Sequence, residues 1–175
     1  MLFNVSQLLR ERVGSRREYR ISEPSVVLER GAEPVGVEGT ALLTRTQSGV
    51  LVQARVLTTA RDACSRCLRD VEYPVRLDIE EEYVPTIDPV TGVRLPEPED
   101  PEAFRIDQRH HLDLSEAVRE YLVAAEAMQP LCRPDCAGLC PVCGADRNVD
   151  RCGCEVQTPD PRWAALARLR VPEGS

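Results

Sequence analysis

Eight cysteines arranged in four close pairs constrain this chain more than any other feature of its sequence. The pairs are Cys64 with Cys67, Cys132 with Cys136, Cys140 with Cys143, and Cys152 with Cys154. Gaps of one to three residues between cysteines allow two thiolates to converge on one tetrahedral metal ion. The sequence therefore predicts a metal-binding protein in which all eight cysteines are candidate ligands.

The even number of cysteines suits two sites of four thiolates each. The most compact partition places Cys140, Cys143, Cys152 and Cys154 on one ion and leaves Cys64, Cys67, Cys132 and Cys136 for a second. The alternative is a single ion with spare or redox-active thiols, because close cysteine pairs also occur in switches that release zinc on oxidation. Zinc is the expected metal, since thiols in a reducing cytosol serve as ligands more readily than as disulfides.

Length and hydropathy limit the organisation of the chain. With 175 residues, 42% of them hydrophobic, it can bury one core but is too short for two full domains beside a cysteine-rich module. No basic stretch precedes an apolar run at the start, and no run of about 18 apolar residues occurs. A cytoplasmic protein without a membrane span is therefore expected.

Patterns of apolar residues predict a small antiparallel β-sheet. Segments 37–44 and 50–59 are rich in β-branched and aliphatic residues and are separated by a turn-forming stretch. Segment 71–79 alternates strictly, and Pro74 within it indicates an edge strand. The first cysteine pair then lies in the connection between two strands, where a tight turn directs both sulfurs the same way.

Helical periodicity predicts a short helix over 5–12 and a second helix over 114–125 that covers the sheet. The expected fold class is therefore α+β, a small antiparallel sheet domain with a covering helix and a C-terminal zinc-ribbon-like cysteine module. The expected boundaries are 1–129 for the β-rich domain, 130–156 for the module, and 157–175 for a C-terminal helix and tail.

Charge is distributed unevenly along the chain, which carries a net charge of −7. The acidic loop 84–103 is rich in proline and carboxylates and has no periodicity, so it is expected to be mobile. The N-terminal stretch is basic instead, and Arg16 and Arg17 are candidate contacts for RNA phosphates. A solvated arginine pair is the simpler interpretation of those two residues.

Catalytic motifs are missing from the sequence. It has no phosphate-binding glycine loop, nucleophile elbow or Ser/His/Asp arrangement. Four thiolates at about 2.3 Å from zinc leave the ion no open coordination position, so such a site scaffolds the chain and does not activate water. We therefore expect neither an enzyme nor a small-molecule substrate.

Several segments together resemble one protein family. They are the opening NVSQLLRERVGSRREY at 4–19, CSRCL at 64–68, EEEY at 80–83, PLCRPDCAGLCPVCGADRN at 130–148, CGC at 152–154 and DPRWAALARL at 160–169. This combination is similar to the YceD family, the large ribosomal RNA subunit accumulation proteins. All eight cysteines match the cysteines of that family one by one.

The resemblance implies a non-catalytic role in making, processing or accumulating 23S ribosomal RNA. The implied partner is large-subunit pre-rRNA or a ribosomal protein, and the acidic loop favours a protein. The sequence also leaves two other functions open, a redox-responsive zinc switch or chaperone and a transcription-associated zinc-ribbon adaptor.

Overall fold

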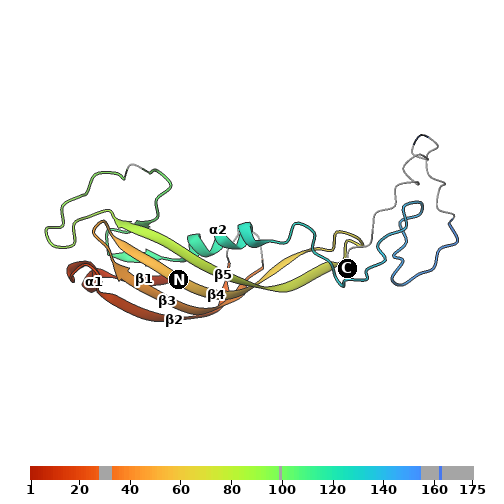
Figure 1. Cartoon of the computed structure of the whole chain (residues 1–175), viewed down its shortest axis with the longest axis horizontal. Coiled ribbons are helices and arrows are strands. Elements are labelled where there is room, and N and C mark those ends of the chain that lie inside the picture. Colours follow the sequence, from red (N-terminus) through yellow and green to blue (C-terminus); the bar gives the residue numbers. More distant parts are fainter. Residues whose placement is uncertain (28–32, 99, 155–161, 163–175) are drawn as a thin grey trace, which may run out of the picture. The chain divides into compact units, whose positions relative to one another are not determined.

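The computed structural model describes residues 1–27, 33–98, 100–154 and 162 (Figure 1). The chain packs as two compact units. Unit 1 comprises Met1–Asp62 with Val71–Met128, and unit 2 comprises Ala63–Asp70 with Gln129–Ser175. The helix expected within 157–175 lies, apart from Arg162, outside the described residues.

Unit 1 is built on a curled sheet in which the described residues form seven strands (Figure 1). The strands are β1 (Leu2–Asn4), β2 (Arg16–Val26), β3 (Val35–Arg45), β4 (Val50–Ala63), β5 (Asp70–Pro85), β6 (Arg105–Ile106) and β7 (His111–Asp113). Their order across the sheet is β1-β7-β6-β5-β4-β3-β2. The pairs β1–β7, β6–β7, β2–β3 and β3–β4 are antiparallel, whereas β5 and β6 run parallel.

Strict alternation explains why the central strands form. On β3 the side chains of Val37, Ala41 and Leu43 are buried, and on β4 those of Val50 and Val52 are buried, while the residues next to them on each strand are exposed or half-buried. A period of two residues places one apolar face on the core. The predicted strands 37–44 and 50–59 therefore lie inside β3 and β4.

Pro74 lies in a part of β5 that has a neighbouring strand on one side only. Strand β6 pairs only with Val84 and Pro85 of β5, so the described residues give the stretch around Pro74 only β4 as a neighbour. A proline lacks the N–H that a second neighbouring strand would require. The position of Pro74 thus costs the sheet no ladder hydrogen bond on its open side.

Two helices contribute to the core of unit 1. Helix α1 (Ser6–Arg10) buries Leu8 and Leu9, and helix α2 (Ser115–Ala125) buries Ala117, Val118 and Leu122. These side chains belong to the same hydrophobic cluster as the inward residues of the sheet. Figure 1 shows α2 running alongside the sheet, and in the chain α2 follows β6 and β7.

The acidic loop forms no helix among its described residues, and its local order comes from turns. Asp88 accepts hydrogen bonds from the backbone N–H groups of Val90 and Thr91 at 2.9 and 2.6 Å. An isolated bridge joins Ile87 to Arg94. The described residues of the loop therefore form an irregular segment that turns and one isolated bridge organise.

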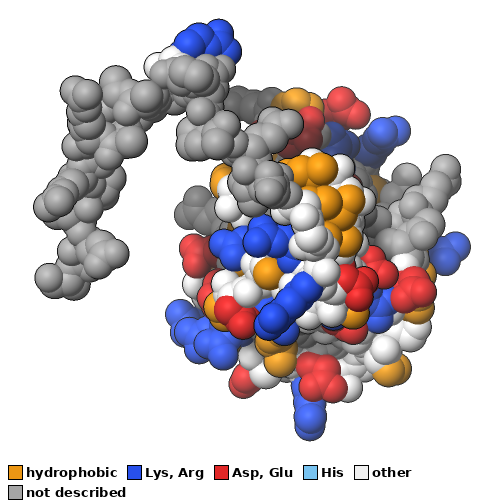
Figure 2. Space-filling view, turned by 90° about the vertical axis from the view of Figure 1, so that its right-hand side faces the viewer, with side chains coloured by type: hydrophobic (Ala, Val, Ile, Leu, Met, Phe, Trp, Pro, Cys, Tyr) orange, Lys and Arg blue, Asp and Glu red, His pale blue; other side chains and the backbone are white. Residues whose placement is uncertain are grey.

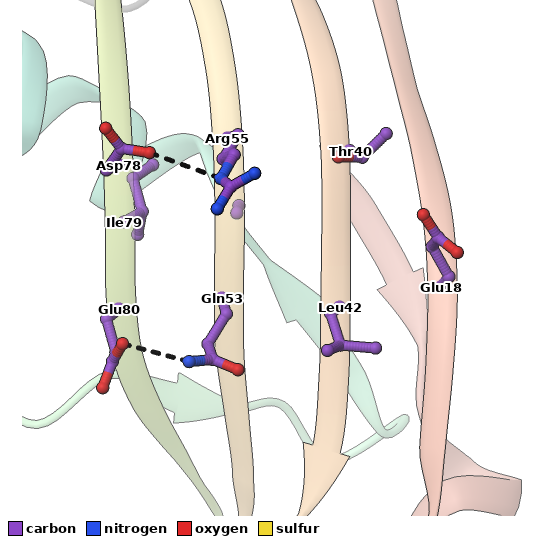
Figure 3. Close-up of a pocket in the computed structure, with 9 residues that line it drawn as sticks. Glu18, Thr40, Leu42, Gln53, Arg55, Asp78, Ile79 and Glu80 are labelled. Carbon is purple, nitrogen blue, oxygen red and sulfur yellow. Dashed lines mark hydrogen bonds and ion pairs between the residues drawn. The ribbon is translucent and has the colours of Figure 1, made fainter.

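The outward face of the sheet is polar and carries a shallow hollow of about 390 Å³ (Figure 3). Side chains from β2, β3, β4 and β5 line it, including Glu18, Gln53 and Glu80. Arg55 and Asp78 lie 3.7 Å apart across it, and both are largely exposed, so the pair stabilises the sheet little. Neither a histidine nor a cysteine lines this hollow.

Candidate metal centres

The described residues of unit 2 form no aliphatic core like that of unit 1. Its buried hydrophobic residues, within the described part of the chain, are Cys64, Cys67, Cys136 and Cys140. The only other buried residues there are Pro130 and Gly138. A segment that buries so little aliphatic surface does not recover its ordering entropy from the hydrophobic effect. Metal ligation by the cysteines would be a further source of stability for these described residues.

The two Cys-x-x-Cys segments have the same backbone geometry. In the first, the N–H of Leu68 donates to the carbonyl of Cys64 at 2.9 Å, and the N–H of Cys64 donates to Arg69 at 2.8 Å. In the second, the N–H of Gly144 donates to Cys140 at 2.9 Å, and the N–H of Cys140 donates to Ala145 at 2.8 Å. Both turns therefore hold their paired sulfurs in the same way.

Each turn ends in a left-handed residue, Leu68 with φ of 59° and Gly144 with φ of 73°. Glycine adopts this conformation without strain, whereas a leucine there costs roughly 1–2 kcal/mol. The Leu68 side chain is also exposed. The first turn is therefore held against local strain by its backbone hydrogen bonds to Cys64 and Arg69.

The first cluster joins the strand connection to the segment after α2. The N–H of Ser65 donates to the carbonyl of Pro130 at 2.8 Å, which draws the second segment against the first. The sulfurs of Cys64 and Cys136 then lie 3.9 Å apart, and those of Cys67 and Cys132 lie 3.6 Å apart. All four sulfurs are within 4.8 Å of one another.

These distances match a tetrahedral metal site. Four sulfurs at about 2.3 Å from zinc have neighbouring sulfurs about 3.8 Å apart, whereas a disulfide brings two sulfurs to about 2.05 Å. All eight cysteines are free thiols in this structure. The donor set and its spacing therefore fit a four-coordinate thiophilic ion in the first cluster.

The second cluster comprises Cys140, Cys143, Cys152 and Cys154, whose sulfurs also lie within 4.8 Å of one another. Its members are less buried than those of the first cluster. Cys143 is exposed, and Cys152 and Cys154 are half-buried. The structure thus brings together the same two groups of four that the spacing favours, and it gives them different exposure to solvent.

The thiols within each cluster differ in acidity. Hydrogen bonds from backbone N–H groups lower the pKa of Cys64 and of Cys140 to about 6 each. Burial raises the pKa of Cys132 to about 12, and a hydrogen bond shared with Cys143 raises that of Cys154 to about 12. The lowered pKa of Cys64 and of Cys140 favours the thiolate, which is the form that ligates a metal, and a bound cation would displace protons from the other thiols.

Charged groups surround the clusters without forming a surface of one sign. The Arg66 guanidinium donates to the carbonyl of Cys136 at 2.9 Å, and Arg69 pairs with Asp146 at 3.1 Å. On the face drawn in Figure 2, positive and negative side chains of the described residues are interspersed around a group of hydrophobic ones. Such a surface does not have the uniformly positive charge of a general nucleic-acid binder.

Arg16 and Arg17 occupy adjacent positions of β2 in unit 1. Successive side chains of a strand point to opposite faces, and Arg16 is exposed whereas Arg17 is half-buried. Arg17 forms an ion pair with Glu11 at 2.5 Å, which raises the pKa of the guanidinium above its usual value. The two arginines therefore do not form one joint positive patch.

Comparison with known proteins identifies the family of the chain. The family model described as large ribosomal RNA subunit accumulation protein YceD matches residues 52–170, which include both cysteine clusters. The chain belongs to the YceD family. This family is described as an accumulation factor for the large ribosomal RNA subunit.

Curated relatives of this YceD chain come from mycobacteria. An uncharacterized protein of Mycobacterium tuberculosis is 31% identical over 149 residues, which cover 82% of this chain and 69% of the relative. An uncharacterized protein of Mycobacterium leprae is 27% identical over 154 residues, covering 88% of this chain and 67% of the relative. No solved structure matches the chain significantly. Among the described residues, no helix has the length and hydrophobicity that crossing a bilayer requires.

Proposed function

We propose that this YceD protein is a non-catalytic, zinc-binding factor of ribosome biogenesis that supports the synthesis, processing or accumulation of 23S rRNA in the cytoplasm. The observation that carries the proposal is the pair of four-cysteine clusters in a unit whose described residues form no aliphatic core. The family of the chain is described by rRNA accumulation. Zinc suits the donor set because it accepts four thiolates in a tetrahedron.

In this proposal both ions are structural. The ligands are Cys64, Cys67, Cys132 and Cys136 for the first ion and Cys140, Cys143, Cys152 and Cys154 for the second. An ion held by four thiolates has no open position for water or substrate, so it stabilises a shape and performs no reaction. The second cluster with its turn acts as the zinc-ribbon-like module, and α2 acts as the cover of the sheet.

The proposed partner is large-subunit pre-rRNA or a ribosomal protein. The acidic loop 84–103 supports a basic protein partner, because opposite charges steer association and a polyanion such as RNA is repelled there. Arg16 and Arg17 remain the proposed RNA contacts, with exposed Arg16 available for a phosphate and Arg17 already paired with Glu11.

Deletion of the gene in the organism that encodes it tests this function. The expected result is a lower ratio of mature 23S to 16S rRNA, which the wild-type gene restores. An allele carrying Cys64→Ser and Cys67→Ser is expected not to restore it, because serine does not replace a thiolate ligand of zinc. An allele carrying Arg16→Ala and Arg17→Ala tests the RNA contact in the same assay.

The matched control is an Asp70→Asn allele, which changes an exposed residue beside the same turn without removing a sulfur. It is expected to restore the ratio. An unchanged 23S to 16S ratio in the deletion strain would contradict a role in large-subunit rRNA accumulation. Full restoration of the ratio by the Cys64→Ser, Cys67→Ser allele would show that the role does not require metal at the first cluster.

A further inference from the structure

Asn148 connects the two cysteine clusters. It lies between Cys143 and Cys152, in the loop 144–151 that joins two pairs of ligands of the second cluster. Its side chain nevertheless reaches the first cluster, where Nδ2 donates to the sulfur of Cys136 at 3.4 Å. A residue carried by one site therefore contacts a ligand of the other.

The orientation of the Asn148 amide is fixed by its other partners. Its Oδ1 accepts hydrogen bonds from the backbone N–H of Ala137 and from Arg133, both at 2.8 Å. Its Nδ2 also donates to Asp146 at 2.6 Å. An oxygen must face the two donors and a nitrogen must face the carboxylate, so one N–H remains for the sulfur. All hydrogen-bonding groups of this side chain are thus in use.

The loop that carries Asn148 is held against the segment that carries Cys136. Leu139 and Asp146 form an isolated bridge, and the N–H of Arg147 donates to Gly138 at 2.9 Å. Gly138 has φ of 72°, and a Cβ there would lie 3.0 Å from the carbonyl oxygen of Arg66. A glycine is needed at this point to let the chain pass so close to the first turn.

We propose that Asn148 is a positioning residue that makes metal binding at the two clusters cooperative. An ion on Cys143 and Cys152 fixes both ends of the loop, which places the Asn148 amide against the Cys136 sulfur. An N–H donor to a ligating sulfur stabilises the ligand in its metal-bound geometry. Metal at the second cluster therefore strengthens binding at the first, and by linkage the reverse also holds. This inference rests on the metal sites of the proposed function.

Cadmium binding to the full chain tests the proposal, because ¹¹³Cd NMR resolves the two thiolate sites during a titration with chelator. Asn148→Ala is expected to lower the Cd²⁺ affinity of the first cluster about 10- to 100-fold, the usual effect of removing a hydrogen bond to a ligand. Asn148→Asp is expected to act in the same direction, since it keeps the acceptor for Ala137 and removes the N–H donor.

A chain without the second metal site shows whether the effect of Asn148→Ala depends on metal at that site. In a chain with Cys152→Ser and Cys154→Ser, the first cluster is expected to bind Cd²⁺ more weakly, and Asn148→Ala is expected to add almost nothing further. The matched control is Val149→Ala, which alters an exposed neighbour in the same loop and is expected to leave both affinities unchanged.

Two results would overturn the coupling while leaving the metal sites in place. One is unchanged affinity in Asn148→Ala with two ions bound. The other is an equal loss of Cd²⁺ affinity from Asn148→Ala with and without the second site. In that case Asn148 would stabilise the first cluster alone. A wild-type chain that binds no Cd²⁺ or Zn²⁺ would overturn the proposed metal sites, and the coupling with them.

Discussion

Removal of metal is expected to unfold unit 2 and leave the sheet of unit 1 folded. The buried apolar residues of unit 2, in the part that the structure describes, are almost all cysteines, whereas unit 1 packs a continuous aliphatic cluster. Structural zinc supplies on the order of 10 kcal/mol, which equals the entire stability of a small domain. If the proposed ions are bound, their loss therefore removes the principal stabilising interaction of unit 2 and leaves the core of unit 1 intact.

Hydrogen exchange of the full chain, measured with and without a strong chelator under reducing conditions, provides the test. The reporters are the amides of Leu68 and Gly144, which close the two cysteine turns. Their protection is expected to fall by orders of magnitude, while the amides of Ala41 and Val52 in the sheet serve as the internal control. Unchanged protection at both turns in metal-free protein would contradict a structural role for the ions.

Tyr83→Ala is expected to destabilise unit 1 and to spare unit 2, the reverse of what metal removal is expected to do. The Tyr83 ring is 1% exposed and stacks on Phe104 with ring centroids 5.1 Å apart. Truncation of a buried aromatic side chain costs about 3–5 kcal/mol, because it loses burial and leaves a cavity. Unit 1 is therefore expected to lose much of its stability, while unit 2 retains its metal.

Denaturant unfolding of the metal-loaded protein measures this loss, with metal content determined in parallel. The matched variant is Tyr83→Phe, which keeps the ring and removes only the hydroxyl that donates to the carbonyl of Asp113 at 3.2 Å. It is expected to cost about 1 kcal/mol. Equal stability of the Ala and Phe variants would show that the ring does not support the core.

The strands that can be predicted from the sequence are those with one buried and one exposed face. Strands β3 and β4 alternate apolar and polar residues, so segments 37–44 and 50–59 are recognisable without a structure. Strand β2 is not recognisable in this way, because Ile21 is its one buried residue and half of the others are charged. It is a strand because β3 supplies a partner for its backbone, and that tertiary pairing has no local signature.

Cysteine spacing predicts the metal centres as alternation predicts the strands, because the length of a turn limits which thiols can meet. The grouping of Cys64 with Cys132 still required the N–H of Ser65 to reach the carbonyl of Pro130, 65 residues away. Asn148 could not be found in this way. Its amide matters only because the loop folds back on Gly138, and no spacing rule marks an asparagine between two ligand pairs.

Native mass spectrometry of the purified chain most directly tests the central claim, that the eight cysteines form two structural zinc sites. The predicted result is two zinc ions per chain, with one remaining after Cys152→Ser and Cys154→Ser and none of the cysteines joined as disulfides. A metal-free chain, or a single ion beside four thiols open to alkylation, would contradict the two-site account and favour the redox-switch interpretation.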